Sequence, residues 1–346
     1  MRWLLRRCVI APAMIGLALL LWSTLPLWLI VAAALAPVLP GRWRALRLLW
    51  MFVVGVTAES ILLVVLFGLW LASGFGRRIR TPYFEGIHYD LVQGLMWVVF
   101  TEAGRVLALR IETEGPSPDA HPGTPLIVAC RHAGPGDSFT LIHTLMDWYH
   151  REPRVVLKET MAWDPVVDVV LRRLPARFIE PNPGQGQDLE SQIADLARGL
   201  DENDAFVIFP EGGNFTPERR RRGIERLRGR GLDRMAERAS RMAHVLPPRP
   251  GGFLAALDAA PDADVVLVAH TGLDHMLTVR DVWRELPMDK VIVMRWWQVP
   301  REELPTDREE QIEWLFGWWE RIDAWIAENR PQEISRGRSR RTAVAS

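Results

Sequence analysis

The chain has 346 residues, with 42 basic and 42 acidic side chains, so its formal net charge is zero. Nucleic-acid-binding proteins are usually basic as a whole, and this balance argues against that class of partner. Two cysteines, Cys8 and Cys130, are too few for a disulfide framework or a cysteine metal cage, whereas sixteen tryptophans suit a protein at a membrane interface.

Two long apolar segments begin the chain. Residues 9–40 carry no charged side chain, and residues 48–76 carry only Glu59. About 20 apolar residues are enough for a helix to cross a bilayer. We therefore predict a transmembrane or re-entrant helical hairpin over residues 1–80 that turns at Gly41.

Arginines flank each end of the two segments, and a hairpin would place six of them on one side and three on the other. Because basic residues favour the cytoplasmic side, we expect a membrane protein whose remaining domain lies on the cytoplasmic face. A secretory signal peptide is the alternative for the first segment, but the segment is longer than a signal peptide needs and a second one follows it.

From Pro82 onwards the composition is that of a soluble domain, which we place at residues 81–330. Short apolar runs alternate with helical patterns, and this predicts an α/β fold with a mostly parallel central sheet flanked by helices. The expected strands cover residues 107–113, 126–130, 154–157, 178–179, 206–209, 265–269 and 291–295. The expected helices cover residues 84–104, 138–150, 188–200 and 307–328. Residues 331–346 lack apolar periodicity and predict a basic disordered tail.

The first chemically informative stretch is residues 126–138, LIVACRHAGPGDS. His132 follows an apolar strand and is a natural general base, because imidazole titrates near neutral pH. Asp137 could orient the imidazole, since a Gly-Pro-Gly loop lets the chain fold back within five residues. We also expect Asp137 to be the N-cap of the next helix. No serine or cysteine has a nucleophile's context, so the attacking hydroxyl would belong to a substrate.

The second informative stretch is Pro210-Glu211-Gly212-Gly213, which follows the strand at residues 206–209. Parallel strands end at one edge of a sheet, so we expect this turn to meet His132. Its backbone N–H groups could stabilise a developing oxyanion or hold a phosphate. A metal bound by His132, Asp137 and Glu211 is an alternative, although the spacing is not that of a zinc site.

Together these motifs resemble those of the glycerolipid acyltransferase family, of the lysophosphatidic acid acyltransferase type. The family's H-x4-D motif matches His132 and Asp137, and its F-P-E-G motif matches Phe209-Pro210-Glu211-Gly212. Residues 245–253, VLPPRPGGF, are similar to the L-x-P-R-x-x-G-F element of its eukaryotic-like branch. The resemblance covers roughly residues 75–330.

The resemblance implies a membrane-bound O-acyltransferase that needs no cofactor. It would move a fatty acyl group from acyl-CoA, or from an acyl-carrier protein, to the hydroxyl of a lysophospholipid such as 1-acylglycerol-3-phosphate. His132 would be the general base and Asp137 would hold its ring. The residues expected to bind substrate are Glu211, Gly212, Gly213, Lys158, Arg219 and Arg220.

The chain departs from the family pattern at two arginines. The third motif usually continues with Thr-Arg-Ser, whereas this chain has Gly213-Asn214-Phe215, and the F-I-x-R element reads Phe178-Ile179-Glu180-Pro181. The lost arginines would hold the acceptor's phosphate, and Arg177, Arg219 or Arg220 could replace them. Two alternatives therefore stay open, namely an acyltransferase for a different hydroxylated lipid or glycolipid and a catalytically silent membrane scaffold.

Ten arginines gather in residues 218–241. Such a run is typical of a solvated helix. Beside a membrane hairpin it could also bind anionic lipid headgroups or CoA phosphates.

Overall fold

The structure is a computed structural model that describes most of the chain. It covers residues 2–39, 41, 43–116, 123–134, 136–179, 189–274, 283, 285 and 289–331. Of the tail predicted at residues 331–346, only Pro331 lies within this part. Glu180 and Pro181 of the altered F-I-x-R element lie outside it.

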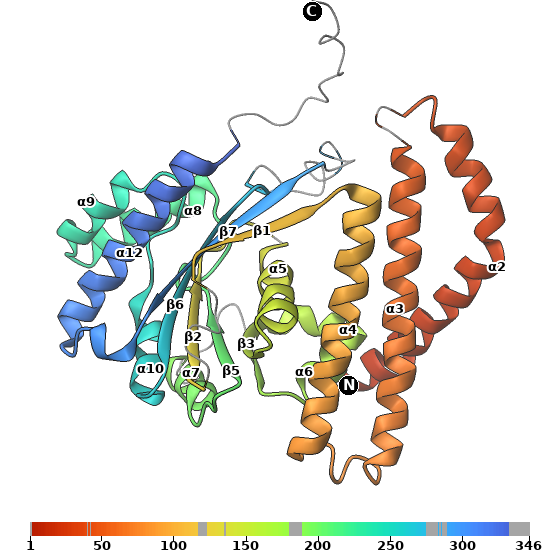
Figure 1. Cartoon of the computed structure of the whole chain (residues 1–346), viewed down its shortest axis with the longest axis horizontal. Coiled ribbons are helices and arrows are strands. Elements are labelled where there is room, and N and C mark those ends of the chain that lie inside the picture. The colour runs from red at the N-terminus through yellow and green to blue at the C-terminus, as the bar shows by residue number, and fades with distance from the viewer. Residues whose placement is uncertain are drawn as a thin grey trace, which may run out of the picture.

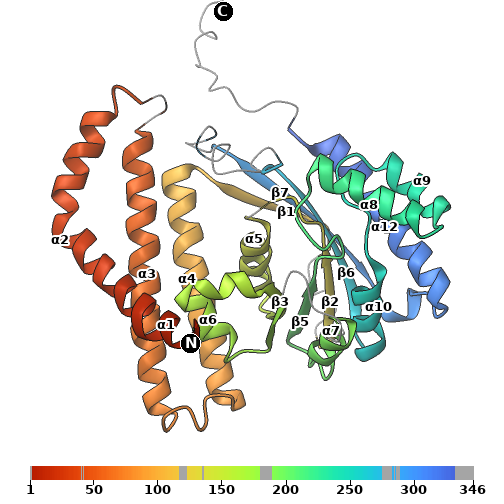
Figure 2. The same ribbon diagram turned by 180° about the vertical axis from the view of Figure 1, so that it is seen from behind.

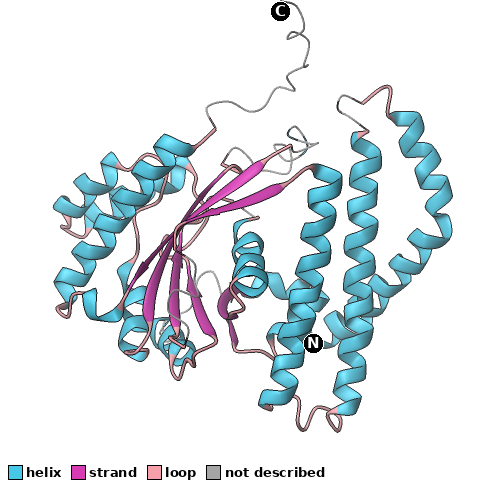
Figure 3. Cartoon of the chain, viewed as in Figure 1, coloured by secondary structure: helices cyan, strands magenta, loops and turns pink. Residues whose placement is uncertain are grey.

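A seven-stranded sheet forms the centre of the molecule, with the order β1-β7-β6-β2-β5-β3-β4 (Figures 1 and 3). The strands β2 to β6 run parallel to one another, β7 runs antiparallel to β6, and β1 runs parallel to β7. The mostly parallel sheet predicted from the sequence is therefore confirmed. The strands are β1 (Arg110–Glu114), β2 (Leu126–Cys130), β3 (Glu152–Lys158), β4 (Ala176–Ile179), β5 (Asp204–Ile208), β6 (Asp264–Thr271) and β7 (Val291–Val299).

Helices cover both faces of this sheet (Figures 1 and 2). On one face Ile127, Phe206 and Leu267 pack with residues of α7 to α10 and α12, and on the other Val128, Val207 and Val268 pack against α5. Strands covered on both sides have no polar face, which is why β2 and β5 are buried along their whole length. The helices of this part are α5 (Asp137–His143), α6 (Pro165–Leu171), α7 (Leu189–Ala197), α8 (Pro217–Gly229), α9 (Asp233–Arg241), α10 (Pro250–Ala259) and α12 (Arg308–Asn329). Shorter helical turns are η3 (Thr144–Trp148), η4 (Glu159–Trp163) and η5 (Arg301–Glu303).

The N-terminal residues form the predicted helical hairpin. Two helices run antiparallel at one end of the molecule (Figure 1), and a third, α4, packs along the second of them. The elements are α1 (Arg2–Leu5), η1 (Arg6–Ile10), α2 (Ala11–Leu35), α3 (Arg44–Ala72) and α4 (Pro82–Leu107). Gly41 lies in the turn with φ +108°, a conformation that favours glycine.

Two stretches, Trp3–Leu35 and Arg44–Ala72, are long and apolar enough to cross a membrane, with mean hydropathies of 2.1 and 2.3. Only 11% and 33% of their most apolar windows are buried, whereas the core helix of a soluble protein would be mostly buried. Length, composition and exposure therefore point weakly towards membrane association.

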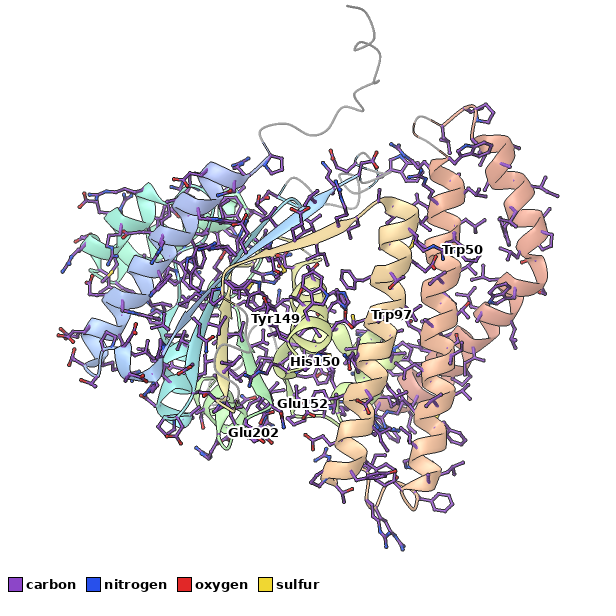
Figure 4. The ribbon with its side chains drawn as sticks, in the orientation of Figure 1. Trp50, Trp97, Tyr149, His150, Glu152 and Glu202 are labelled. Carbon is purple, nitrogen blue, oxygen red and sulfur yellow. The ribbon has the colours of Figure 1, made fainter. Side chains whose placement is uncertain are left out.

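Hydrogen bonds join the hairpin both to α4 and to the α/β part. Trp50, marked on α3 in Figure 4, donates from Nε1 to the Glu102 carboxylate of α4 at 3.0 Å. Arg173, which follows α6, donates to the backbone carbonyl of Leu66 at 2.9 Å.

The strongest connection is an arginine cluster around Asp168 of α6. This carboxylate is fully buried and accepts from Arg6 at 3.1 Å, from Arg7 at 3.0 Å and from Arg172 at 2.8 Å. Arg6 also reaches Glu159 at 3.1 Å and is itself buried. The start of the first apolar helix is thus fixed beside α6, and the N-terminus lies there in both views (Figures 1 and 2).

Some predicted boundaries were wrong for identifiable reasons. The strand expected at residues 107–113 begins at Arg110, because α4 continues to Leu107 and ends at Ala108 with φ +53°. The arginine-rich region is two helices, since Gly231, with φ +72°, ends the first of them.

We expect Asp168→Ala to detach the N-terminus, because it leaves the buried Arg6 guanidinium without its main partner. Breaking a buried ion pair from one side costs about 3 kcal/mol or more. Thermal unfolding in detergent should show a lower Tm, and trypsin should cut sooner at the N-terminus. Asp195→Ala is the matched control, since its pair with Arg198 is exposed. Equal behaviour of the two variants would show that the cluster does not hold the hairpin.

Candidate active site

His132 and Asp137 lie together at the carboxyl end of β2. The His132 Nδ1 atom is 3.3 Å from Asp137 Oδ2, and the same oxygen accepts the Gly134 N–H at 2.6 Å. The Asp137 side chain is fully buried, whereas 17% of the His132 side chain is exposed. One edge of the imidazole is thus held from inside while the ring remains accessible.

Asp137 is not the N-cap of the helix, so that prediction was wrong. Gly136 occupies the cap position, and no side chain caps it. Asp137 is the first residue of α5, and its carboxylate turns back to Gly134 and His132 instead of accepting the N–H groups of the helix.

A second histidine shares the Asp137 carboxylate. His270, buried on β6, places Nε2 3.6 Å from Asp137 Oδ2 and 3.3 Å from the carbonyl oxygen of Arg131. Burial lowers the pKa of His270 below its ordinary value, against the opposing charge of Asp137. For Asp137, burial alone would raise the pKa, but the two histidines and the Gly134 N–H lower it.

An ion pair beneath the site joins the ends of β2 and β6. The buried Arg131 guanidinium donates to Asp274 at 2.7 Å and to the carbonyl of His270 at 2.6 Å. Burial alone would raise the pKa of Asp274, yet Arg131 and the Thr271 hydroxyl lower it. His270, Arg131 and Asp274 were not among the predicted site residues. Their only sequence signal was their position at or just beyond the ends of strands.

Glu211 brings the second motif to the first. Its buried carboxylate accepts the His132 N–H at 3.1 Å through Oε1 and the Leu246 N–H at 3.0 Å through Oε2. In addition, the Phe215 N–H donates to the carbonyl of His132 at 2.7 Å. Burial raises the pKa of Glu211 to about 8, against the opposing effects of Arg131 and the two N–H groups. Both carboxylate oxygens are therefore used inside the protein.

The glycines after Glu211 allow two arginines to lie against the backbone. Gly212 has φ +69°, and its N–H donates to the carbonyl of Phe209 at 2.9 Å. A Cβ at Gly212 would lie 3.2 Å from the Arg249 guanidinium carbon, and one at Gly213 would lie 3.2 Å from Arg219 Nη1. The positive φ favours glycine at position 212, and a Cβ at either position would crowd the end of an arginine side chain.

The other expected binding residues are placed differently from one another. Lys158 is exposed at the carboxyl end of β3, which pairs with β5. Arg219 is exposed beside Gly213 and donates to the carbonyl of Asn214 at 3.0 Å. Arg220 donates instead to the carbonyls of Ser240, at 2.8 Å, and Met242 beyond α9.

Alternative chemistries find little support around His132. Cys130 is fully buried in the core, and burial raises its pKa well above the ordinary value, so it is no thiolate nucleophile. Among the described residues, no three His, Cys, Asp or Glu side chains are placed to hold a metal ion, the set of His132, Asp137 and Glu211 included.

A comparison with protein families agrees with the motif resemblance at the level of an acyltransferase. Residues 110–271, a little under half of the chain, match the family described as acyltransferase. The crystal structure of the 1-acyl-sn-glycerophosphate (LPA) acyltransferase PlsC from Thermotoga maritima is similar at 13% identity and a TM-score of 0.45, over 81% of this chain and 100% of that one. At this TM-score the likeness says nothing about a shared substrate. A search of curated proteins found no match.

The raised pKa of Glu211 predicts a pH-dependent stability. Between its ordinary pKa of 4.5 and about 8 the folded protein holds a proton that the unfolded chain has released. The free energy of unfolding should therefore fall as pH rises through this window, by roughly 1 kcal/mol per pH unit. Glu211→Gln removes the titrating group, so its free energy of unfolding should not fall with pH in this window. The variant also loses one backbone hydrogen bond at every pH. Denaturant titrations at several pH values measure this free energy. An equal dependence on pH in the wild type and the variant would contradict the prediction.

Proposed function

We propose that this chain, whose residues 110–271 match the acyltransferase family, is a membrane-bound O-acyltransferase. It would transfer a fatty acyl group from an acyl thioester to the hydroxyl of a lysolipid. The observation that carries this proposal is the accessible His132 ring held by the buried Asp137 carboxylate. This arrangement provides a base while the neighbouring Cys130 provides no nucleophile.

The geometry suggests how each proton would move. With its Nδ1–H directed at Asp137, His132 keeps a lone pair on Nε2 that accepts the proton of the acceptor hydroxyl. The hydroxyl oxygen attacks the thioester carbonyl and forms a tetrahedral oxyanion. The carbon–sulfur bond then breaks, and the imidazolium returns the proton to the leaving thiolate. Asp137 stabilises the imidazolium between these steps.

Oxyanion stabilisation belongs to the turn after Glu211. The Gly212 N–H already donates to Phe209, so we propose Gly213 as the donor to the oxyanion. Glu211 acts in this scheme as a positioning residue, because its carboxylate holds the backbone of His132.

For the acceptor we propose a lysophospholipid such as 1-acylglycerol-3-phosphate. Lys158 and Arg219 are the exposed cations that we assign to its phosphate, in place of the arginine that Asn214 replaces. That same replacement favours a second candidate, an acyltransferase for a hydroxylated lipid without a phosphate.

We place the catalytic domain on the cytoplasmic face. The Arg6 and Arg7 contacts with Asp168 keep the start of the first apolar helix on the same side as the α/β part. The arginines at both ends of the hairpin favour the cytoplasm for that side. A lipid acceptor would then reach His132 from the adjacent leaflet.

His132→Ala should reduce acyl transfer by about 100-fold to 10,000-fold, the range of general acid–base catalysis. Asp137→Asn should also reduce it strongly, because an amide stabilises the imidazolium less. Radiolabelled acyl-CoA with a panel of lysophospholipids, monoacylglycerol and glycolipids measures the product. His150→Ala, an exposed histidine after η3, is the control and should keep full activity.

The panel also separates the alternatives. A product from phosphate-bearing acceptors supports the lysophospholipid, and a product only from uncharged lipids supports the second candidate. Activity of His132→Ala within a few-fold of wild type would refute the role of His132 as general base. An absence of product with every acceptor would support the alternative of a catalytically silent membrane scaffold.

A further inference from the structure

A row of arginines extends from the Gly212-Gly213 turn along one side of α8. Arg219, Arg226 and Arg230 are separated by seven and four residues, so they fall within a narrow sector of the helix surface. The row rises about 16 Å at 1.5 Å per residue. All three side chains are exposed.

Arg249 adds a fourth cation to this row. The backbone N–H of Arg249 donates to the carbonyl of Pro210 at 2.8 Å, which holds the residue beside the Glu211 turn. Helix α8 approaches the same segment through Gly223, where a Cβ would lie 3.1 Å from Pro247. Arg219, Arg226, Arg230 and Arg249 thus form one surface, here called the arginine face.

Several other arginines of this region pair with carboxylates, whereas those of the arginine face do not. On α8, Arg221 and Arg222 pair with Glu218 at 2.8 and 2.9 Å, and Arg238 of α9 pairs with Glu320 at 2.8 Å. Within the described part of the chain, none of the four residues of the arginine face forms an ion pair. Its cations remain available to an external anion.

The four cations also repel one another. Burial, and then the charges of Arg226, Arg230 and Arg219, lower the pKa of Arg249. Like charges held together without counter-charges destabilise a surface, and an anionic ligand relieves that cost. A guanidinium is suited to phosphate because its planar N–H groups match two phosphate oxygens.

We infer that the arginine face is a subsite for the phosphate groups of a substrate. A row about 16 Å long with four cations is more than one phosphate group requires. A ligand with several phosphates, such as the CoA part of an acyl donor, fits both the length and the charge. The headgroup phosphate of an acceptor lipid is the other source of the same chemistry. This inference rests on the proposed function, because that function orients the substrate with its phosphates on the arginine face and its reacting end at His132.

The first test measures binding without turnover. Free CoA is titrated calorimetrically into the full-length protein in detergent, with pantetheine, which has no phosphate, as the control ligand. We expect Arg226→Gln/Arg230→Gln to weaken CoA binding at least tenfold. The matched control, Arg221→Gln/Arg228→Gln, removes the same charge from the opposite side of the same helix, since both residues lie about 180° or more from Arg219 at about 100° per residue. It should change binding less than twofold. Circular dichroism of both variants verifies that α8 remains folded.

The second test identifies the source of the phosphate. A higher KM for acyl-CoA in Arg226→Gln/Arg230→Gln, with an unchanged KM for the acceptor, assigns the arginine face to the donor. A higher KM for a lysophospholipid but not for monoacylglycerol assigns it to the acceptor.

The inference is overturned if both double variants weaken binding and raise KM equally, because general surface charge would then suffice. It is also overturned if neither variant changes CoA binding or either KM. Selective loss of CoA binding in a protein without acyl transfer would refute the proposed function while keeping the subsite.

Discussion

The carboxylate of Glu211 is the contact on which the rest of the site depends. It receives N–H groups from His132 and Leu246, which lie 79 and 35 residues away in the sequence. One side chain thereby aligns the loop that carries the base and the segment that carries Arg249. Helix α8 then packs on that segment at Pro247, so the arginine face and the imidazole share one support.

Much of the fold was predictable because its signals are local. Continuous apolar runs such as residues 126–130 and 206–209 describe strands buried on both sides, and the parallel arrangement brings their ends to one edge. The predicted meeting of the two motifs is present in the structure, where Phe215 and Glu211 both hydrogen-bond the backbone of His132. The hairpin was equally clear, since an uncharged segment long enough to cross a bilayer favours a membrane helix over a short core helix.

What could not be predicted depends on the order of strands in the sheet and on side-chain direction. His270 lies near Asp137 only because β6 pairs with β2, and no local pattern specifies that pairing. Arg220 and Arg219 are adjacent in the sequence, yet a helix turns by about 100° per residue. Arg220 therefore reaches carbonyls at the end of α9, whereas Arg219 stays beside the glycine turn. Glu211 resembled a binding group, and only its hydrogen bonds with the His132 and Leu246 N–H groups show that both of its oxygens are occupied.

The cluster around Asp168 constrains the order in which the protein is assembled. Arg6 and Asp168 are 162 residues apart, and the chain is synthesised from its N-terminus. Both apolar helices have emerged from the ribosome long before their anchor exists, so the hairpin can enter the lipid first. If the hairpin inserts into a bilayer as proposed, the domain that folds later closes onto an N-terminus already held at the bilayer surface. The proposed active site would then reach the membrane as the last step of folding.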